Sequence, residues 1–247
     1  MRENEALEIL ESLKVILTGS HFVYASGKHG SAYVEKRILY RHTRATSRIA
    51  EIMAEGFRGW GIDVVVGPEK GGIILAQWVA HHLSTAGHEA LAINAEKNER
   101  ILQTANDKDT FNAIGTGSVN LRVVGGEIIH RTSGFSIKHA DVPCVRGKRV
   151  LVVEDIVNSG RSLRAAIEAV TRAGGIVIGT RCLFNRGTFT ADMLYDLKVP
   201  AFMPVLDMTL DQWEEADCPL CHAGILVEQS IGHGREFLER PALRGVA

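Results

Sequence analysis

Short apolar runs alternate with amphipathic stretches along most of the chain. Such runs are typical of strands buried on both faces of a sheet. They lie at residues 63–66, 90–93, 150–153, 176–184 and 199–206. Prolines in the last run cannot donate hydrogen bonds to a ladder, so this run is predicted to be an edge strand. The alternation with helices predicts an α/β fold with a mostly parallel central sheet flanked by helices.

The amphipathic stretches carry apolar residues at helical spacing. Helices are therefore predicted over residues 3–17, 43–58, 73–83 and 163–172. A different pattern follows the first helix, where two short apolar and aromatic runs flank the glycine-bearing segment 26–30. This arrangement predicts a β-hairpin.

The stretch between residues 97 and 150 departs from this alternation. Residues 103–120 are rich in Asn, Asp, Thr and Gly, and residues 121–129 predict a second hairpin around a Gly-Gly turn. So long a connection within a compact domain is usually a lid or a binding loop. We therefore expect an insertion at about residues 100–135 that serves a binding site.

Composition and charge narrow the classes of function. Of the 247 residues, 45% are hydrophobic and 23% are charged, and the formal net charge is -1. This balance gives no reason to expect nucleic acid or an anionic membrane as a partner, and no apolar run approaches the ~20 residues of a membrane span. The acidic start of the chain is unlike a signal peptide, and four cysteines argue against a disulfide scaffold. A globular protein of the cytoplasm is predicted.

The strongest chemical signal follows the apolar run 150–153. Glu154 and Asp155 come next, and the small polar loop 158–162 then leads into the helix predicted over 163–172. Backbone N–H groups at such a helix start suit a phosphate, while carboxylates suit ribose hydroxyls and Mg²⁺. Neither a Walker sequence nor the dinucleotide-binding G-x-G-x-x-G is present here. A sugar-phosphate site is therefore predicted, against the simpler alternative of an ordinary turn with surface acids.

Other polar turns follow the remaining predicted strands. They are residues 67–72, 94–100 and 185–187. Taken alone, the glycine turn 67–72 could simply tighten a connection between strand and helix. Because ligands of parallel sheets bind beyond the carboxyl ends of the strands, we expect all these turns to meet at one site.

Two adjacent cations, Lys36 and Arg37, follow the predicted hairpin. They could form a solvated edge, or they could reach an anionic ligand. The residue pattern leaves both readings open.

A C-x-x-C sequence near the end of the chain is a second candidate site. Cys218 and Cys221 could bind zinc, but a closed site needs four ligands, which His222 and His233 would have to complete. A redox pair of thiols is another reading, and two thiols at a structural turn is a third.

The central stretch resembles the phosphoribosyl-pyrophosphate (PRPP) motif of type I phosphoribosyltransferases. The pattern is four apolar residues, Glu154-Asp155, two apolar residues and then Asn-Ser-Gly-x-Ser. From about residue 19 to 206 the chain resembles the orotate phosphoribosyltransferase family, in the variety with an Ala-Glu-Lys loop and a Cys-Pro-Leu-Cys tail. The resemblance implies the type I phosphoribosyltransferase fold with a small hood hairpin. It also implies Mg²⁺-dependent transfer of ribose 5-phosphate from PRPP to orotate, in a homodimer that shares its sites.

The resemblance implies that residues 1–247 form one domain with three parts. An N-terminal helix and hood would occupy residues 1–40, and the core with its insertion would occupy 41–206. The tail with the Cys-Pro-Leu-Cys sequence would occupy 207–247.

The resemblance also assigns roles to residues. Glu154 and Asp155 would hold the ribose, with Asp155 reaching Mg²⁺ through PRPP, and Arg186 would bind the orotate carboxylate together with Asn158 and Lys36. The PRPP-binding set would be Lys70, Gly71, Lys97, Glu154, Asp155, Ile156, Val157, Asn158, Ser159, Gly160, Arg161 and Ser162.

The catalytic loop departs from the family pattern. The Lys-x-x-Lys-x-His-Gly sequence is absent, and Glu96-Lys97 is the best match to its start. Lys97 is therefore the predicted catalytic cation, with Arg131, Lys138 or His139 as the cation from the far side of the loop. These departures leave three alternatives open: transfer to another nucleobase, a PRPP-sensing regulator without catalysis, and a zinc-stabilised interaction module.

Overall fold

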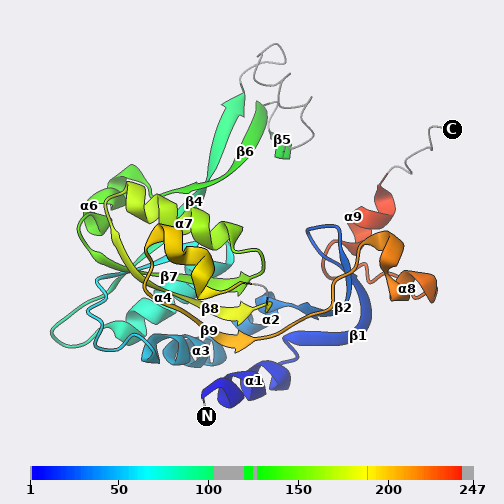
Figure 1. Cartoon of the computed structure of the whole chain (residues 1–247), viewed down its shortest axis with the longest axis horizontal. Helices are drawn as coiled ribbons and strands as arrows, with labels where there is room; N and C mark the ends of the chain where they lie inside the picture. Colours follow the sequence, from blue (N-terminus) through cyan, green and yellow to red (C-terminus); the bar gives the residue numbers. More distant parts are fainter. Residues whose placement is uncertain (1, 103–119, 125–126, 188, 241–247) are drawn as a thin grey trace.

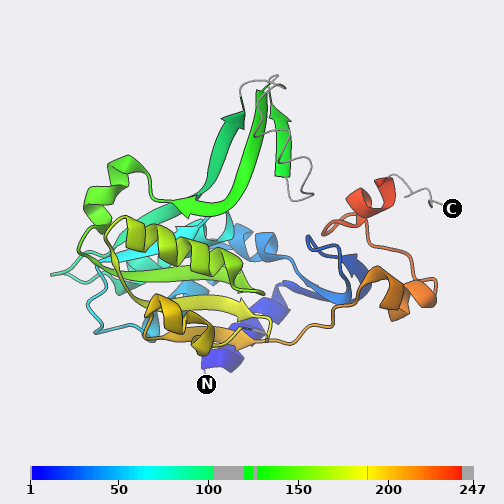
Figure 2. The same cartoon turned by 45° about the horizontal axis from the view of Figure 1, so that its top comes forward.

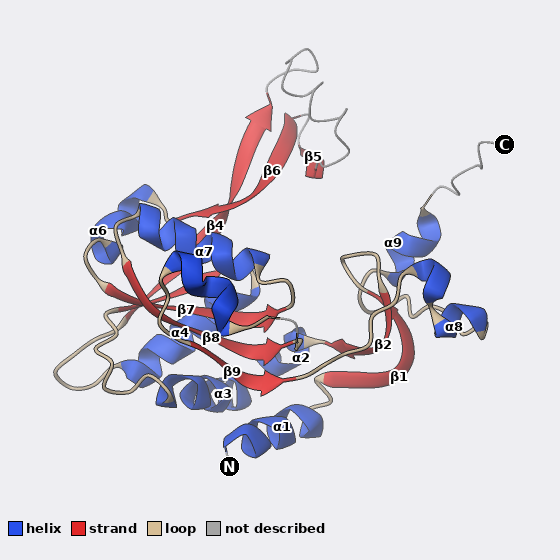
Figure 3. Cartoon of the chain, in the orientation of Figure 1, coloured by secondary structure: helices blue, strands red, loops and turns tan. Residues whose placement is uncertain are grey.

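A central seven-stranded sheet organises the chain in the computed structural model, which describes residues 2–102, 120–124, 127–187 and 189–240. The strand order is β5-β6-β4-β3-β7-β8-β9 (Figure 3). Neighbouring strands are parallel from β4 to β9, whereas β6 pairs antiparallel with both β4 and β5. The bounds are β3 (Val64–Pro68), β4 (Leu91–Leu102), β5 (Asn120–Val124), β6 (Glu127–Ser136), β7 (Arg149–Val157), β8 (Ile176–Asn185) and β9 (Phe202–Asp207). The prediction of a mostly parallel α/β sheet with β9 at its edge is confirmed.

Helices cover both faces of this sheet (Figure 1). On one face lie α1 (Arg2–Ser12), α3 (Thr43–Glu55) and α4 (Gly71–Leu83), and on the other lie α6 (Val142–Val145) and α7 (Arg161–Arg172). Leu151 and Val153 pack into the first core, whereas Val150 and Val152 pack into the second. This alternation explains why β7 is a continuous apolar run. In the described ranges no helix is long and apolar enough to cross a lipid bilayer.

A small two-stranded sheet lies beyond the carboxyl ends of the central strands (Figures 1 and 2). It consists of β1 (Ile16–Val23) and β2 (His29–Val34), which pair antiparallel as predicted for the hairpin. We call this sheet the hood. It continues into α2 (Lys36–Arg41), which leads to α3 on the face of the main sheet.

The last part of the chain wraps around the hood. After β8 come the 3₁₀ segment η2 (Ala191–Leu197) and β9, and then η3 (Glu215–Asp217), α8 (Pro219–His222) and α9 (Gly234–Glu239). The backbone of His29 exchanges hydrogen bonds with that of Trp213 at 2.8 and 2.9 Å, and His21 forms a bridge with Val227. The tail is therefore held to the hood by main-chain bonds.

The helix predicted over residues 3–17 is shorter than expected. The helix α1 ends at Ser12, and Ile16 and Leu17 belong to β1. Lys14 adopts a positive φ of 55°, and the N–H of Val15 closes the turn onto the carbonyl of Leu10 at 2.9 Å. A left-handed residue ends a helix, whereas apolar spacing alone does not report backbone conformation.

The strand predicted at residues 90–93 is longer than expected. The strand β4 continues through the charged segment 96–100 to Leu102, because β6 supplies an antiparallel partner there. The hairpin predicted at 121–129 is confirmed by β5 and β6, and its Gly-Gly turn lies outside the described residues, as do residues 103–119. These strands form an arm that extends away from the body of the sheet (Figure 2). η1 (His139–Asp141) follows β6 and leads into α6.

We predict that Leu151→Ala in β7 lowers the free energy of unfolding by about 2–5 kcal/mol, because it removes a fully buried side chain from the first core. Urea denaturation followed by circular dichroism measures the change. The matched control is Leu226→Ala, whose side chain is 88% exposed and should change stability by about 0.5 kcal/mol or less. Equal effects of the two substitutions would contradict the assignment of the core.

Candidate active site

Two adjacent carboxyl groups are buried near the end of β7. Glu154 and Asp155 are exposed by only 6% and 4%. Burial and the neighbouring Asp155 carboxylate raise the pKa of Glu154 well above its ordinary value. Buried carboxyl groups are costly unless a partner or a ligand compensates them, so this pair indicates a functional site.

The partner of Asp155 comes from the segment between the hood and α3. Lys36, at the start of α2, forms an ion pair with Oδ2 of Asp155. Arg37 instead pairs with Glu35, whose carboxylate accepts from its Nε at 2.9 Å and its Nη2 at 2.7 Å. The two adjacent cations therefore have different surroundings: Lys36 reaches the carboxylate of Asp155, and Arg37 lies at the solvated edge.

The turn after β3 approaches the same carboxylates from the side. A methyl group on Gly71 would overlap Oδ2 of Asp155, so only glycine allows this approach. Lys70 precedes α4 after a cis peptide bond with Glu69. The hydroxyl of Tyr40 donates to the carbonyl of Gly71 at 3.0 Å. Burial and the nearby carboxylates raise the pKa of Tyr40, which keeps it a hydrogen-bond donor.

The loop after β7 forms a small cup at the start of α7. Its cavity of about 110 Å³ is lined by Glu154 and residues 156–163. Gly160 has a positive φ of 71°, and a methyl group there would overlap the ring of Phe189. The cup lies at the amino end of the twelve-residue helix α7, where the first backbone N–H groups have no partner within the helix and suit a phosphate.

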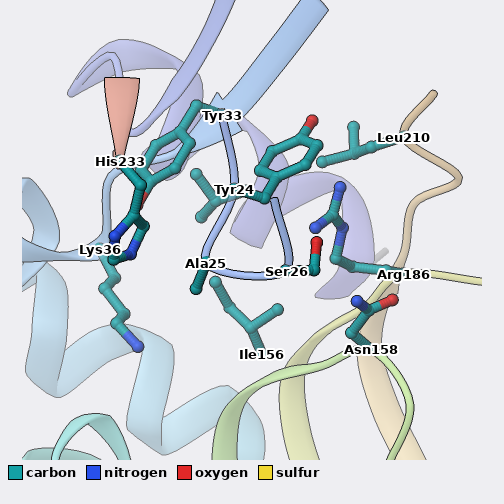
Figure 4. Close-up of a pocket in the computed structure, with 11 residues that line it drawn as sticks. Tyr24, Ala25, Ser26, Tyr33, Lys36, Ile156, Asn158, Arg186, Leu210 and His233 are labelled. Atoms are coloured by element: carbon teal, nitrogen blue, oxygen red, sulfur yellow. The ribbon is translucent and has the colours of Figure 1, made fainter. Parts of the chain in front are cut away.

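A larger pocket of about 200 Å³ lies between the hood and the sheet (Figure 4). It combines residues from the loop between β1 and β2, from β2 and from the start of α2 with residues at the end of β7 or just after β7 and β8, and with two positions in the tail. All three predicted orotate-binding residues line it. The lining residues are Tyr24, Ala25, Ser26, Tyr33, Val34, Lys36, Ile156, Asn158, Arg186, Leu210 and His233.

Arg186 gives this pocket its chemical character. Its guanidinium carbon lies 4.4 Å from the centroid of the Tyr24 ring, and the residue is only 9% exposed. Its Nε and Nη2 are buried with no hydrogen-bond partner among the described residues. Because guanidinium N–H groups fit a carboxylate in bidentate geometry, this pocket suits a small anionic and planar ligand.

The side chain of Tyr24 is held in place by a hydrogen bond within the hood. Its hydroxyl donates to the carbonyl of Ala32 at 2.6 Å. Burial raises the pKa of Tyr24, and the charge of Arg186 opposes part of that rise. The ring is therefore held as a neutral platform beside the guanidinium.

The predicted loop cations lie at the base of the arm. Lys97 on β4 is exposed and does not line the pocket, and its backbone N–H donates to the Glu69 carboxylate at 3.2 Å. Lys138 pairs with Glu96 at 2.7 Å. Arg131 is placed on β6 opposite Glu99, and its side chain lies outside the described part of the chain. Among the described side chains, Lys97 is therefore the candidate catalytic cation that lies beside the glycine turn 67–72.

The tail histidines are not where the C-x-x-C interpretation required them. His222 bonds the carbonyl of Ala216, and His233 lines the pocket and contacts Glu236. The groups that surround Cys218 and Cys221 are instead His21 and His29 of the hood. The prediction that His222 and His233 complete the site is therefore wrong.

Sequence reasoning missed several lining residues of the pocket. It assigned no role to Tyr24, Leu210 or His233 as pocket walls. The aromatic residues of the hairpin were a usable signal, because aromatic side chains near a polar loop often form binding surfaces. Leu210 and His233 carried no local signal, since folding alone brings the tail beside the hood.

Comparisons with known proteins agree with this geometry. A family model described as the phosphoribosyl transferase domain matches residues 37–199. The orotate phosphoribosyltransferase of Caldanaerobacter subterraneus subsp. tengcongensis is 32% identical over 225 residues, covering 91% of this chain and 95% of that protein. That of Thermotoga maritima is 29% identical over 227 residues, covering 92% and 97%.

A solved structure shows the same fold. The orotate phosphoribosyltransferase of Mycobacterium tuberculosis H37Rv, in a crystal structure with PRPP, superposes with a TM-score of 0.56 at 22% identity. The match covers 84% of this chain and 97% of that chain.

We predict that Gly71→Ala displaces the Asp155 carboxylate and lowers the free energy of unfolding by about 1–3 kcal/mol. Thermal unfolding measured by calorimetry checks the change. The matched control is Gly87→Ala, because no atom lies within 4 Å of the added methyl group. A Gly71→Ala protein as stable as this control would contradict the close approach.

Proposed function

Because the chain belongs to the orotate phosphoribosyltransferase family of phosphoribosyltransferases, we propose that it transfers ribose 5-phosphate from PRPP to N1 of orotate. The products are orotidine 5'-monophosphate and pyrophosphate. The observation that carries this proposal is the buried Arg186 guanidinium, which has unpartnered N–H groups in a pocket beside the PRPP motif.

Orotate fits the pocket by charge and by shape. Its carboxylate would accept two hydrogen bonds from Arg186, replacing the partners that this buried side chain lacks. The Tyr24 ring would pack against the guanidinium of Arg186. Lys36 and Asn158, which also line the pocket, would face the orotate ring. A purine without a carboxylate would leave the guanidinium unpaired, which disfavours it by the cost of a buried unsatisfied charge.

PRPP would occupy the neighbouring cup and turn. The backbone N–H groups of 158–162 would bind the 5-phosphate, and Glu154 and Asp155 would accept from the ribose hydroxyls. Lys70 and Gly71 would face the pyrophosphate at the start of α4. The phosphate anchor is remote from the reacting carbon, so its binding energy positions the sugar for reaction.

The residues present fit a divalent metal ion, and we assign Mg²⁺. The carboxylates of Glu154 and Asp155 are oxygen donors, which hard cations prefer. When bound with PRPP, Mg²⁺ would neutralise charge on the pyrophosphate.

The chemistry needs charge stabilisation more than a base. Departure of pyrophosphate leaves positive charge on C1 of the ribose, and the site must bind the departing polyanion and exclude water. Lys70 would bind the pyrophosphate from the turn, and Lys97 would approach it from the arm. Orotate is already anionic, so no general base is assigned.

We also propose a homodimer in the cytoplasm. The arm of β4, β5 and β6 extends away from the body of the sheet, which suits contact with a second copy (Figure 1). The cysteines among the described residues are free thiols, as expected in a reducing compartment.

The proposal is tested by following the loss of orotate absorbance in the presence of PRPP and Mg²⁺. We expect Mg²⁺-dependent turnover, and we expect Arg186→Gln to lower kcat/KM for orotate about 10- to 100-fold, because it removes a charged hydrogen-bonding partner. Thermal stabilisation by PRPP should remain in this variant, since Arg186 lies outside the phosphate cup. The matched control is Arg58→Gln, an exposed residue of the ion pair with Glu51, which should keep full activity.

Two other outcomes would move the assignment. Stabilisation by PRPP without turnover of orotate would favour another nucleobase or a PRPP-sensing regulator. The absence of both turnover and stabilisation by PRPP would show that the motif has been misinterpreted.

We predict that Lys97→Ala lowers kcat at least 10-fold while KM for orotate changes little, because the ammonium would act on the departing pyrophosphate and not on the base. Steady-state kinetics with saturating PRPP measures both constants. The control is Lys148→Ala, an exposed lysine that precedes β7 at the amino end of the strand. Full turnover by Lys97→Ala would exclude the proposed role.

A further inference from the structure

Four metal-binding side chains meet where the tail packs against the hood. His21 comes from β1 and His29 from the start of β2, while Cys218 immediately precedes α8 and Cys221 lies within it. Their ligand atoms all lie within 4.8 Å of one another. Figures 1 and 2 show α8 beside the two hood strands, although nearly two hundred residues separate them in the chain.

We propose that these four residues form a structural zinc site that fastens the tail to the hood. Two thiolates and two imidazoles are a donor set that selects Zn²⁺ and closes a tetrahedral shell without an open position. The site is distinct from the substrate pocket, because none of the four residues lines that pocket.

Three distances between a nitrogen and a sulfur atom of the cluster fit tetrahedral coordination. Zinc bonds of the usual lengths place a nitrogen and a sulfur ligand about 3.5 Å apart, and two nitrogens about 3.3 Å apart. His21 Nε2 lies 3.5 Å from Cys218 Sγ and 3.7 Å from Cys221 Sγ, and His29 Nδ1 lies 3.2 Å from Cys221 Sγ. The two imidazole nitrogens are 2.8 Å apart and would separate by about 0.5 Å on binding.

The surrounding residues orient the ligands. The carbonyl of Ile225 accepts from Nδ1 of His21 at 2.7 Å, which leaves the lone pair of Nε2 available within the cluster. The ring of Phe237 packs edge-on against His29, with 4.7 Å between centroids. His21, His29 and Cys218 are fully buried and Cys221 is partly buried, so most of the cluster is shielded from water.

The arrangement fits zinc better than the two other readings of the C-x-x-C sequence. A disulfide between Cys218 and Cys221 would use neither imidazole, although both rings direct a nitrogen at the thiols. A simple structural turn would not require two buried histidines from another sheet. Binding of one metal ion uses all four groups together.

The position of the site links it to the substrate pocket. His21 and His29 bracket the hairpin loop that carries Tyr24 and Ser26, and the tail that follows α8 carries His233 into the same pocket. Zinc would therefore fix the wall of the pocket formed by the hood relative to the wall formed by the tail. This role does not require the proposed transferase activity.

The test begins with inductively coupled plasma mass spectrometry, which measures the metal content of the full-length protein purified without chelators. We expect one zinc ion per chain, and we expect Co²⁺ substitution to give the visible absorption of tetrahedral thiolate coordination. Removal of zinc by a chelator in the absence of substrates should lower the midpoint of thermal unfolding, and added Zn²⁺ should restore it.

Variants assign the ligands. The double substitution Cys218→Ser with Cys221→Ser, and separately His29→Ala, should each abolish stoichiometric zinc. The matched control is Cys144→Ser in α6, which lies outside the cluster and should retain zinc.

Three results would overturn the proposal. They are wild-type protein that neither contains zinc nor binds added Zn²⁺, zinc retained in the double cysteine variant, and a native mass showing the Cys218–Cys221 disulfide. Zinc content is measured without substrate, so these results are distinguishable from a failure of the transferase assay.

Discussion

Two carboxyl groups are buried side by side at the end of the central strand β7, and much of the site is arranged around the free-energy cost of keeping them there. Lys36 supplies a positive charge from the start of α2, and glycine at position 71 lets the turn after β3 pack closely against the Asp155 carboxylate. The hydroxyl of Tyr40 holds that turn in place. In the proposed complex, a divalent cation bound with the ligand would add positive charge beside the same carboxylates.

The pocket between the hood and the sheet contains a buried charge without a hydrogen-bonding partner on two of its nitrogens, within the part of the chain that the structure describes. Arg186 follows β8, yet the ring that supports its guanidinium belongs to the hood. Such a pocket is complete only when the hood lies at a fixed distance from the sheet. The tail contributes to this placement through main-chain bonds between His29 and Trp213, and the proposed zinc site would add a stronger link close by.

Much of the fold could be predicted because local patterns carry it. The run Val150–Val153 packs into two cores, and a strand buried on both faces has to be apolar at successive positions. Glu154, Asp155 and the Gly160 loop were recognisable because a strand end, two acids and a helix start are contiguous. The end of α1 and the length of β4 were not predicted, since a left-handed Lys14 and an antiparallel partner strand leave no apolar period in the sequence.

Local sequence patterns were enough to predict the mostly parallel α/β sheet, the polar loop between β7 and α7, and the family, because each rests on residues that are neighbours in the chain. The folded chain was needed to show that Lys36 and not Arg37 reaches Asp155, and that the Tyr24 ring packs against Arg186. It also replaced the expected histidine ligands of Cys218 and Cys221 with His21 and His29. The physical reason is distance along the chain: spacing rules describe side chains within one helix or strand, whereas contacts between the two ends of a chain exist only after the core between them has formed.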